Sequence, residues 1–209
     1  MAIGGVLLAA GEAKRLGGRP KALLRRDGVS LLRRNALILL EAGVSPLVVV
    51  LGHRSEELAP EVQDLAAEVI LAPDYATGKR ASVRRGLAAL PEGLAGFVVA
   101  LADQPALEVA DARRLIDQWR RLGGKLPVIP RVGGRRGNPV ILPDRARVEV
   151  LAAPPGVACR EWLDQHGEPC WLDTDQAGYV LDVDSQLDVE QLLTERGIAL
   201  TWPEEDKDA

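Results

Sequence analysis

The chain is poor in cysteine and in aromatic residues. Its 209 residues include only two cysteines, one phenylalanine, two tyrosines and four tryptophans. Cys159 and Cys170 lack C-x-x-C spacing and have no neighbouring His/Cys set, so the pattern excludes a zinc finger and predicts free thiols. The tryptophans are too scattered to indicate a stacking platform. His53 and His166 lack a partner pattern for acid/base work, which favours a surface or packing role for each.

Long hydrophobic runs and an excess of basic charge are also absent. No apolar run reaches the roughly 18 residues of a membrane helix, and no signal-peptide pattern occurs, so we expect a cytoplasmic protein with no membrane partner. Lys and Arg total 26 against 30 Asp and Glu, a net charge of −4. This balance argues against nucleic acid as a partner, and the scattered Arg pairs are typical of solvated helix faces.

Two familiar phosphate-binding glycine patterns, G-x-G-x-x-G and G-x-x-x-x-G-K-[ST], are missing as well. In their place, the apolar run that ends in Leu8-Ala9-Ala10 leads directly into a small-residue turn containing Gly11, Gly17 and Gly18. Glycine backbone can approach an anion closely and offer its amides as donors. This turn therefore predicts a phosphate-binding loop.

The turn also contains two spaced cations, Arg15 and Lys21. A guanidinium can bind two phosphate oxygens and an ammonium acts as a point charge, a pair that suits a polyphosphate. The alternative is a polar turn with solvated side chains. Position favours the phosphate loop, because ligands of open α/β sheets lie outside the carboxyl ends of the strands.

Short apolar runs alternate with helical patterns along the first half of the chain. The runs are rich in Val, Leu and Ile, as strands buried on both faces are. Expected strands are 3–9, 47–51, 69–71 and 97–102; expected helices are 31–40, capped by Ser30 and stopped by Gly43, then 55–58, 81–90 and 108–122. This alternation predicts a Rossmann-like three-layer α/β sandwich with a mostly parallel sheet.

The second half is less regular. We expect strands at 126–130, 139–142 and 179–183 and helices at 160–166 and 187–193. The length suits one domain, which we place at residues 1–203, with 204–209 as an acidic, disordered tail.

Two carboxylate positions are candidate magnesium ligands. Asp103 follows the expected strand 97–102, and Asp184 follows the expected strand 179–183. Mg²⁺ prefers one or two carboxylates together with phosphate oxygens and waters. The alternatives are that Asp103 caps the turn before Pro105 and that Asp182 or Asp184 caps the helix that follows.

Two further loops are candidate ligand contacts. Gly78 and Ser82 lie where a glycine loop enters a helix, which can present amides and a hydroxyl to a base or a phosphate, although Ser82 is equally suited to be a helix N-cap. Arg135 and Arg136 precede the turn Gly137-Asn138-Pro139, where they either bind the phosphate of an acceptor or are solvated.

Taken together, these motifs resemble the MobA-like nucleotidyltransferases, which include molybdenum cofactor cytidylyltransferase and guanylyltransferase. L-A-A-G-x-x-x-R-L-G-x-x-P-K is similar to their opening motif, L-A-D-Q-P to their metal-binding D-x-P element and G-N-P-V to a turn of the acceptor site. D-V-D-S resembles their D-I-D-T-P-E-D-L ending, with Gln186 in place of the proline. Methylerythritol phosphate cytidylyltransferases are less similar, because the H-D-A-A-R-P run is absent.

The resemblance implies transfer of CMP from CTP to a phosphorylated acceptor, most simply molybdopterin, with release of pyrophosphate. Ala9-Ala10-Gly11 resembles cytidylyl members, whereas guanylyl relatives read A-G-G. By resemblance Arg15, Lys21 and Asp103 are catalytic, Asp103 and Asp184 hold Mg²⁺, and the nucleotide contacts are Leu8, Ala9, Ala10, Gly11, Arg15, Lys21, Gly78 and Ser82. Alternatives are guanylyl or sugar-phosphate nucleotidyl transfer, and a non-catalytic cofactor chaperone for a molybdoenzyme client.

Overall fold

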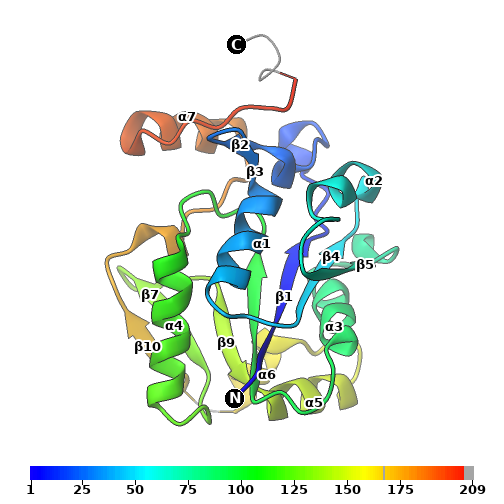
Figure 1. The fold of residues 1–209 in the computed structure, drawn as a ribbon, viewed down its shortest axis with the longest axis vertical. Coiled ribbons are helices and arrows are strands. Elements are labelled where there is room, and N and C mark those ends of the chain that lie inside the picture. Colours follow the sequence, from blue (N-terminus) through cyan, green and yellow to red (C-terminus); the bar gives the residue numbers. More distant parts are fainter. Residues whose placement is uncertain (167, 205–209) are drawn as a thin grey trace.

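The computed structural model describes residues 1–166 and 168–204. Apart from a two-stranded sheet of β2 (Arg25–Arg26) and β3 (Val29–Ser30), one sheet of eight strands runs through the centre of the described residues (Figure 1). Its strands are β1 (Ile3–Ala9), β4 (Leu47–Leu51), β5 (Ala67–Leu71), β6 (Gly96–Leu101), β7 (Val128–Val132), β8 (Arg135–Arg136), β9 (Val140–Pro143) and β10 (Cys170–Asp173). Their order is β10-β7-β9-β6-β1-β4-β5, with β8 paired to β7.

Among the described residues, four of the seven strand pairs of this sheet are parallel. β1 pairs in parallel with β4 and β6, β4 with β5, and β7 with β10, whereas β9 is antiparallel to both β6 and β7. The helices are α1 (Leu31–Glu41), α2 (Ser55–Leu58), α3 (Lys79–Ala89), α4 (Val109–Arg121), α5 (Asp144–Ala152), α6 (Cys159–Gln165) and α7 (Gln186–Arg196). The predicted fold class, a Rossmann-like three-layer sandwich, is confirmed.

Two apolar cores separate the layers. Side chains of β1 alternate between them, because successive residues of a strand point to opposite faces. Leu7 packs in the core that contains residues of α1 and α4, whereas Val6 and Leu8 pack in the core that contains residues of α3, α5 and α6. This double burial explains why the strand reads as one continuous apolar run.

Sequence signals set the limits of α1. The Ser30 hydroxyl accepts a hydrogen bond from the Arg33 amide at 3.2 Å, as an N-cap does. Gly43 follows the helix with φ of 88°, a left-handed conformation that favours glycine. Both predicted signals are confirmed.

Three sequence predictions differ from the structure. Residues 179–183 are not a strand: a short 3₁₀ helix, η5 (Ala177–Tyr179), precedes an irregular segment, and the last strand of the sheet is β10. Tyr179 is buried, and its hydroxyl donates to the Asp111 carbonyl at 2.8 Å, so this apolar run fills a core without strand pairing. Helix α5 was not predicted, and β5 is a half-exposed edge strand.

The structure describes only the first residue, Glu204, of the tail predicted at 204–209. Glu204, which we assigned to the tail, forms an ion pair with Arg19, and residues 205–209 lie outside the described part. No helix within the described residues is long and apolar enough to cross a membrane.

Close packing of α3 on the sheet gives a test of the fold. A Cβ on Gly86 would lie 2.4 Å from a methyl group of Val6 and 2.8 Å from one of Val50. We expect Gly86→Ala to lower the free energy of unfolding by about 1–3 kcal/mol, because overpacking outweighs the better helix propensity of alanine. Urea denaturation measures the change.

A matched control is Gly156→Ala, where the added methyl group meets no atom within 4 Å. This variant should stay within about 0.5 kcal/mol of the parent. Equal stability of the two variants would contradict the tight contact between α3 and the sheet.

Candidate active site

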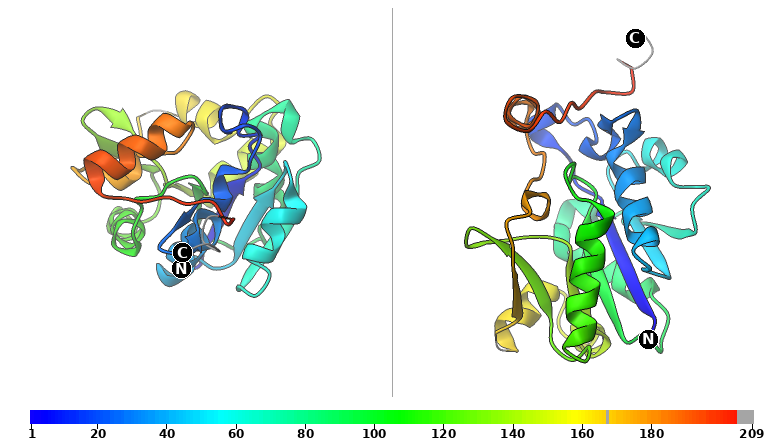
Figure 2. Two further views of the ribbon diagram at one scale, coloured as in Figure 1. Left: turned by 90° about the horizontal axis from the view of Figure 1, so that it is seen from above. Right: turned by 60° about the vertical axis from the view of Figure 1, so that its left-hand side comes forward.

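A pocket lies where β1 and β6 end, at the carboxyl edge of the sheet. The left view of Figure 2 looks down on this end of the molecule, which α7 partly covers. The pocket has a volume of about 190 Å³. Its lining residues are Leu8, Ala9, Ala10, Gly11, Pro20, Lys21, Ala22, Tyr75, Lys79, Ser82, Leu101, Ala102 and Asp103.

Lys21 is the centre of charge at the rim of this pocket. It begins the 3₁₀ helix η2 (Lys21–Leu23), and its side chain is 20% exposed. The ammonium forms one ion pair with Asp103 Oδ2 and another with Asp184 Oδ1, the latter at 2.7 Å. Two carboxylates that are far apart in the chain therefore meet at one cation.

The close approach of Lys21 to the two carboxylates shifts the pKa values of the charged groups around it. Burial works to lower the pKa of Lys21, but Asp103 and Asp184 outweigh it, and the pKa lies above its ordinary value. The hydrogen bond from Lys21 lowers the pKa of Asp184. Burial, with Asp103 and Asp184 nearby, raises the pKa of Asp182. Lys21 is therefore charged at neutral pH.

Backbone contacts hold Asp103 in place. Asn35, fully buried in α1, donates from Nδ2 to the carbonyls of Gln104 at 3.1 Å and Ala102 at 3.4 Å, on either side of Asp103. The Asp103 carbonyl accepts from the Val183 amide at 3.1 Å, which ties the segment that bears Asp184 to the end of β6. These contacts fix the two carboxylates relative to each other.

Gln104 connects the end of β6 to two neighbouring segments. Its buried side chain donates from Nε2 to the carbonyls of Tyr179 at 3.0 Å, Asn138 at 3.2 Å and Gly178 at 3.3 Å. The turn at Gly137-Asn138 and the η5 segment are therefore both anchored beside Asp103. Sequence reasoning placed Gln104 within a motif but assigned it no role.

The predicted phosphate loop is shaped by left-handed backbone. Ala13, Gly17 and Gly18 have φ of 48°, 67° and 76° around the 3₁₀ helix η1 (Lys14–Leu16). His53 braces this loop: Nε2 lies 3.1 Å from the Gly18 carbonyl, and Nδ1 lies 3.4 Å from the Tyr75 hydroxyl. Of the two roles predicted for His53, surface or packing, the contacts favour packing, and they lie beside the pocket that Tyr75 lines.

Seven of the ten predicted site residues line the pocket, and Arg15, Gly78 and Asp184 do not. Arg15 is 73% exposed and lies 3.8 Å from Asp184 Oδ2. Gly78 is the N-cap of α3, and Ser82 lies inside that helix, so the N-cap alternative for Ser82 is wrong.

The capping alternatives for the two aspartates also fail. Ser185, rather than either Asp182 or Asp184, caps α7. Asp103 Oδ2 is taken by Lys21, and Oδ1 is buried with no hydrogen-bond partner in the described residues.

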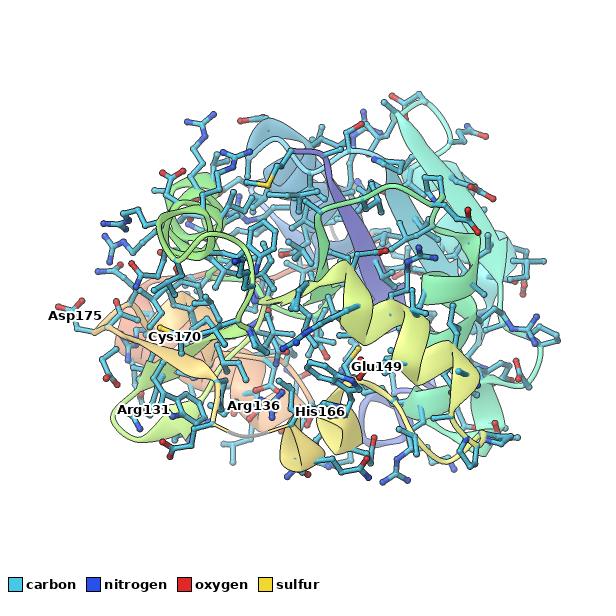
Figure 3. The ribbon with its side chains drawn as sticks, turned by 90° about the horizontal axis from the view of Figure 1, so that it is seen from below. Arg131, Arg136, Glu149, His166, Cys170 and Asp175 are labelled. Carbon is cyan, nitrogen blue, oxygen red and sulfur yellow. The ribbon has the colours of Figure 1, made fainter. Side chains whose placement is uncertain are left out.

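Arg135 and Arg136 lie away from the pocket lining. Arg135 reaches the Val180 carbonyl at 3.4 Å, and Arg136 lies beside α6, where burial and nearby Arg160 lower its pKa (Figure 3). The two residues form β8, and adjacent residues of a strand point to opposite faces. The two guanidinium groups therefore reach different parts of the molecule.

His166 packs on α6, as predicted. Its ring stacks on Trp162 at 4.2 Å, and Nε2 lies 2.9 Å from Glu149 Oε2 (Figure 3).

The carboxylate oxygens of Asp103 and Asp184 suit a divalent cation whose other ligands come from a bound substrate. No cluster of three His, Cys, Asp or Glu side chains suited to a metal occurs in residues 1–166 and 168–204. Asp103 Oδ1 is nevertheless a buried carboxylate oxygen with no hydrogen-bond partner among the described residues, and Asp184 pairs with the same lysine as Asp103. One or two carboxylates completed by phosphates and waters are a typical Mg²⁺ set.

Pocket residues outside the predicted set are Pro20, Ala22, Tyr75, Lys79, Leu101 and Ala102. Lys79 is the charged one among them. A lysine directly after Gly78 in a proposed ligand loop was the signal that could have identified it.

A pocket at the carboxyl edge of a mostly parallel sheet lies where open α/β proteins bind their ligands, which places this chain among the ligand-binding α/β proteins. The MobA-like NTP transferase domain family matches residues 5–172. The chain belongs to this family.

Two curated relatives illustrate the range of the family. "Nicotine blue oxidoreductase" of Paenarthrobacter nicotinovorans is 34% identical over 161 residues, 74% of this chain and 77% of that protein. "Probable molybdenum cofactor guanylyltransferase" of Opitutus terrae is 37% identical over 117 residues, 54% of this chain and 55% of that protein. The chain spans between 24% and 55% of the length of several curated relatives.

The fold also matches solved structures. Rv0371c of Mycobacterium tuberculosis superposes with a TM-score of 0.76 at 28% identity, over 92% of this chain and 98% of that one. A structure of Rv0371c in complex with manganese gives a TM-score of 0.75 at 27% identity over the same shares.

The charge cluster can be tested by titration in metal-free protein. Lys21→Met should raise the pKa of Asp184, because the hydrogen bond and charge that lower this pKa are removed. The carboxyl ¹³C chemical shift of Asp184 measured against pH, in the presence of a chelator, reports the change. Lys125→Met, an exposed site outside the pocket, is the matched control and should leave this titration unchanged.

Proposed function

We propose that the protein transfers CMP from CTP to a phosphorylated small-molecule acceptor of the molybdopterin class and releases pyrophosphate. The observation that carries the proposal is the meeting of Lys21, Asp103 and Asp184 at the rim of the pocket. Cations and carboxylates arranged at a strand edge suit a metal-bound triphosphate. A molybdoenzyme would then be the client of the product, and the cytoplasm its setting.

The proposed reaction needs no nucleophile from the protein. A phosphate oxygen of the acceptor attacks the α-phosphorus of the nucleotide, and the bond between this phosphorus and the oxygen bridging to the β-phosphate breaks. The electron pair leaves with pyrophosphate, so no proton must be moved. Catalysis by the chain consists of orienting the reactants and stabilising charge.

In this proposal, Lys21 and Arg15 hold the leaving pyrophosphate, and the glycine turn at Gly11 offers backbone to the phosphates. Asp103 Oδ1 and Asp184 are the groups that would hold Mg²⁺. When bound, the ion would neutralise phosphate charge and polarise the α-phosphate. The solved complex of Rv0371c with manganese supports divalent-cation binding in a relative of similar fold.

The preference for CTP rests on three residues that line the pocket. Ala9 ends β1, Ala10 begins the loop that follows, and Ser82 supplies a hydroxyl from α3. A compact loop after β1 would suit a pyrimidine better than a purine. The similarity to a protein named as a guanylyltransferase makes GTP the second candidate.

An assay of pyrophosphate release distinguishes nucleotidyl transfer from two other functions, redox activity and cofactor binding without turnover. The relative named as an oxidoreductase suggests redox activity on a similar fold, and a cofactor chaperone would bind without turnover. Release of pyrophosphate that depends on both nucleotide and phosphorylated acceptor supports nucleotidyl transfer. Its absence with CTP, GTP, ATP and UTP, each offered with molybdopterin and a sugar 1-phosphate, would contradict the proposal.

Asp103 gives the first functional prediction. Asp103→Ala should abolish Mg²⁺-dependent pyrophosphate release while the protein stays folded, because the side chain lies at the pocket rim and outside the apolar cores. Turnover by a coupled pyrophosphate assay, with circular dichroism for folding, measures both. Asp173→Ala is the matched control: Asp173 ends β10 and pairs with Arg131 outside the pocket, so its loss should leave turnover unchanged.

Nucleotide choice gives the second functional prediction. We expect kcat/KM with CTP to exceed that with GTP by about tenfold or more, since a site that hydrogen-bonds one base leaves polar groups unpaired with another. UTP should be rejected less strongly. Competition between the nucleotides with molybdopterin as acceptor gives the ratio, and an equal or higher kcat/KM with GTP would refute the CTP assignment while leaving nucleotidyl transfer intact.

A further inference from the structure

Lys79 is a second lysine in the wall of the pocket. It is the first residue of α3 and lines the pocket together with Lys21, Asp103 and Ser82. The preceding Gly78 has φ of 115° and ψ of 169°, a conformation that side chains rarely allow, and this turn starts the helix at the pocket wall. The local backbone therefore directs one more cation to the site.

Lys79 has no carboxylate partner within ion-pair distance in the described part of the chain, whereas Lys21 has two, Asp103 and Asp184. The residue as a whole is exposed, yet the surrounding protein removes enough water to lower its pKa, and nearby Lys21 lowers it further. An unpaired ammonium partly stripped of water gains most from an anionic ligand.

The other cations of α3 have protein partners. Arg80 pairs with Glu161 at 2.6 Å, and Arg85 pairs with Asp74 at 2.9 Å. Arg84 donates to the carbonyls of Val157 and Leu151, each at 3.1 Å. Lys79 thus differs from its neighbours on the same helix, because its side chain faces the pocket and they contact protein.

We propose that Lys79 binds the α-phosphate of the nucleotide and stabilises the charge that develops there during transfer. This inference rests on the proposed nucleotidyl transfer and adds a catalytic residue to it. Lys79 lines the same pocket as Asp103, the candidate metal ligand, whereas Arg15 is not among the lining residues. Lys79 therefore acts at the reacting phosphorus, and Lys21 and Arg15 act on the leaving group.

Ligands that carry different parts of the nucleotide test this assignment. Calorimetric titration of wild type and Lys79→Met with CTP, CMP, cytidine and inorganic pyrophosphate separates the α-phosphate from the base and from the leaving group. Lys79→Met should weaken CTP and CMP by about tenfold or more, the scale of one hydrogen bond to a charged group. Affinities for cytidine and pyrophosphate should stay within about twofold of wild type.

Turnover supplies a second measurement. Lys79→Met should lower kcat at saturating CTP by about tenfold or more, because a contact that strengthens in the transition state affects the chemical step. Arg80→Met removes one positive charge from the next residue of the same helix and should change neither binding nor kcat. If Lys79→Met does not fold by circular dichroism, Lys79→Arg, which keeps the charge and alters its shape, should show a measurable loss of CMP affinity.

Each other outcome has a defined meaning. Unchanged CMP affinity, or an equal loss with cytidine or pyrophosphate, would overturn the assignment of Lys79 to the α-phosphate while wild-type turnover still supports nucleotidyl transfer. Failure of wild-type protein to bind any nucleotide or to release pyrophosphate would overturn the proposed function itself, together with this inference.

Discussion

The ion pairs of Lys21 with Asp103 and Asp184 are the constraint on which the site depends. An ammonium that is mostly removed from water is stable only when opposite charge accompanies it. Because the partners come from the end of β6 and from the segment before α7, this one cation joins three distant parts of the chain. The pocket and its charge distribution therefore form together.

Hydrogen bonds from uncharged side chains fix the positions of the charged groups in this cluster. Asn35 and Gln104 are both buried amides that donate to backbone carbonyls around Asp103. Such contacts leave the carboxylate itself free to interact with cations, since the backbone takes the structural role. On the outer side of the phosphate loop, Arg19 lies over the Trp202 ring at 3.9 Å, so the C-terminal segment also packs against this loop.

The comparisons show one scaffold with differently named functions. A chain of this family shares 34% identity with a protein named as an oxidoreductase and 37% with one named as a guanylyltransferase. Membership of one family therefore does not by itself decide the chemistry, which depends on the side chains of the individual site. In this chain Lys79 and Ser82, both on α3, are polar side chains of the pocket lining.

The sequence by itself determined the parallel sheet, the first four strands and the loop residues after β1, because continuous apolar runs and glycine turns are local signals. It failed at residues 179–183, where an apolar run is buried without strand pairing, and at α5, whose pattern is mixed. Only the tertiary structure decided that Asp103 and Asp184 share Lys21 and that Lys79 enters the pocket. The physical reason is that contacts between distant segments depend on strand order and loop path, which leave no local pattern in the sequence.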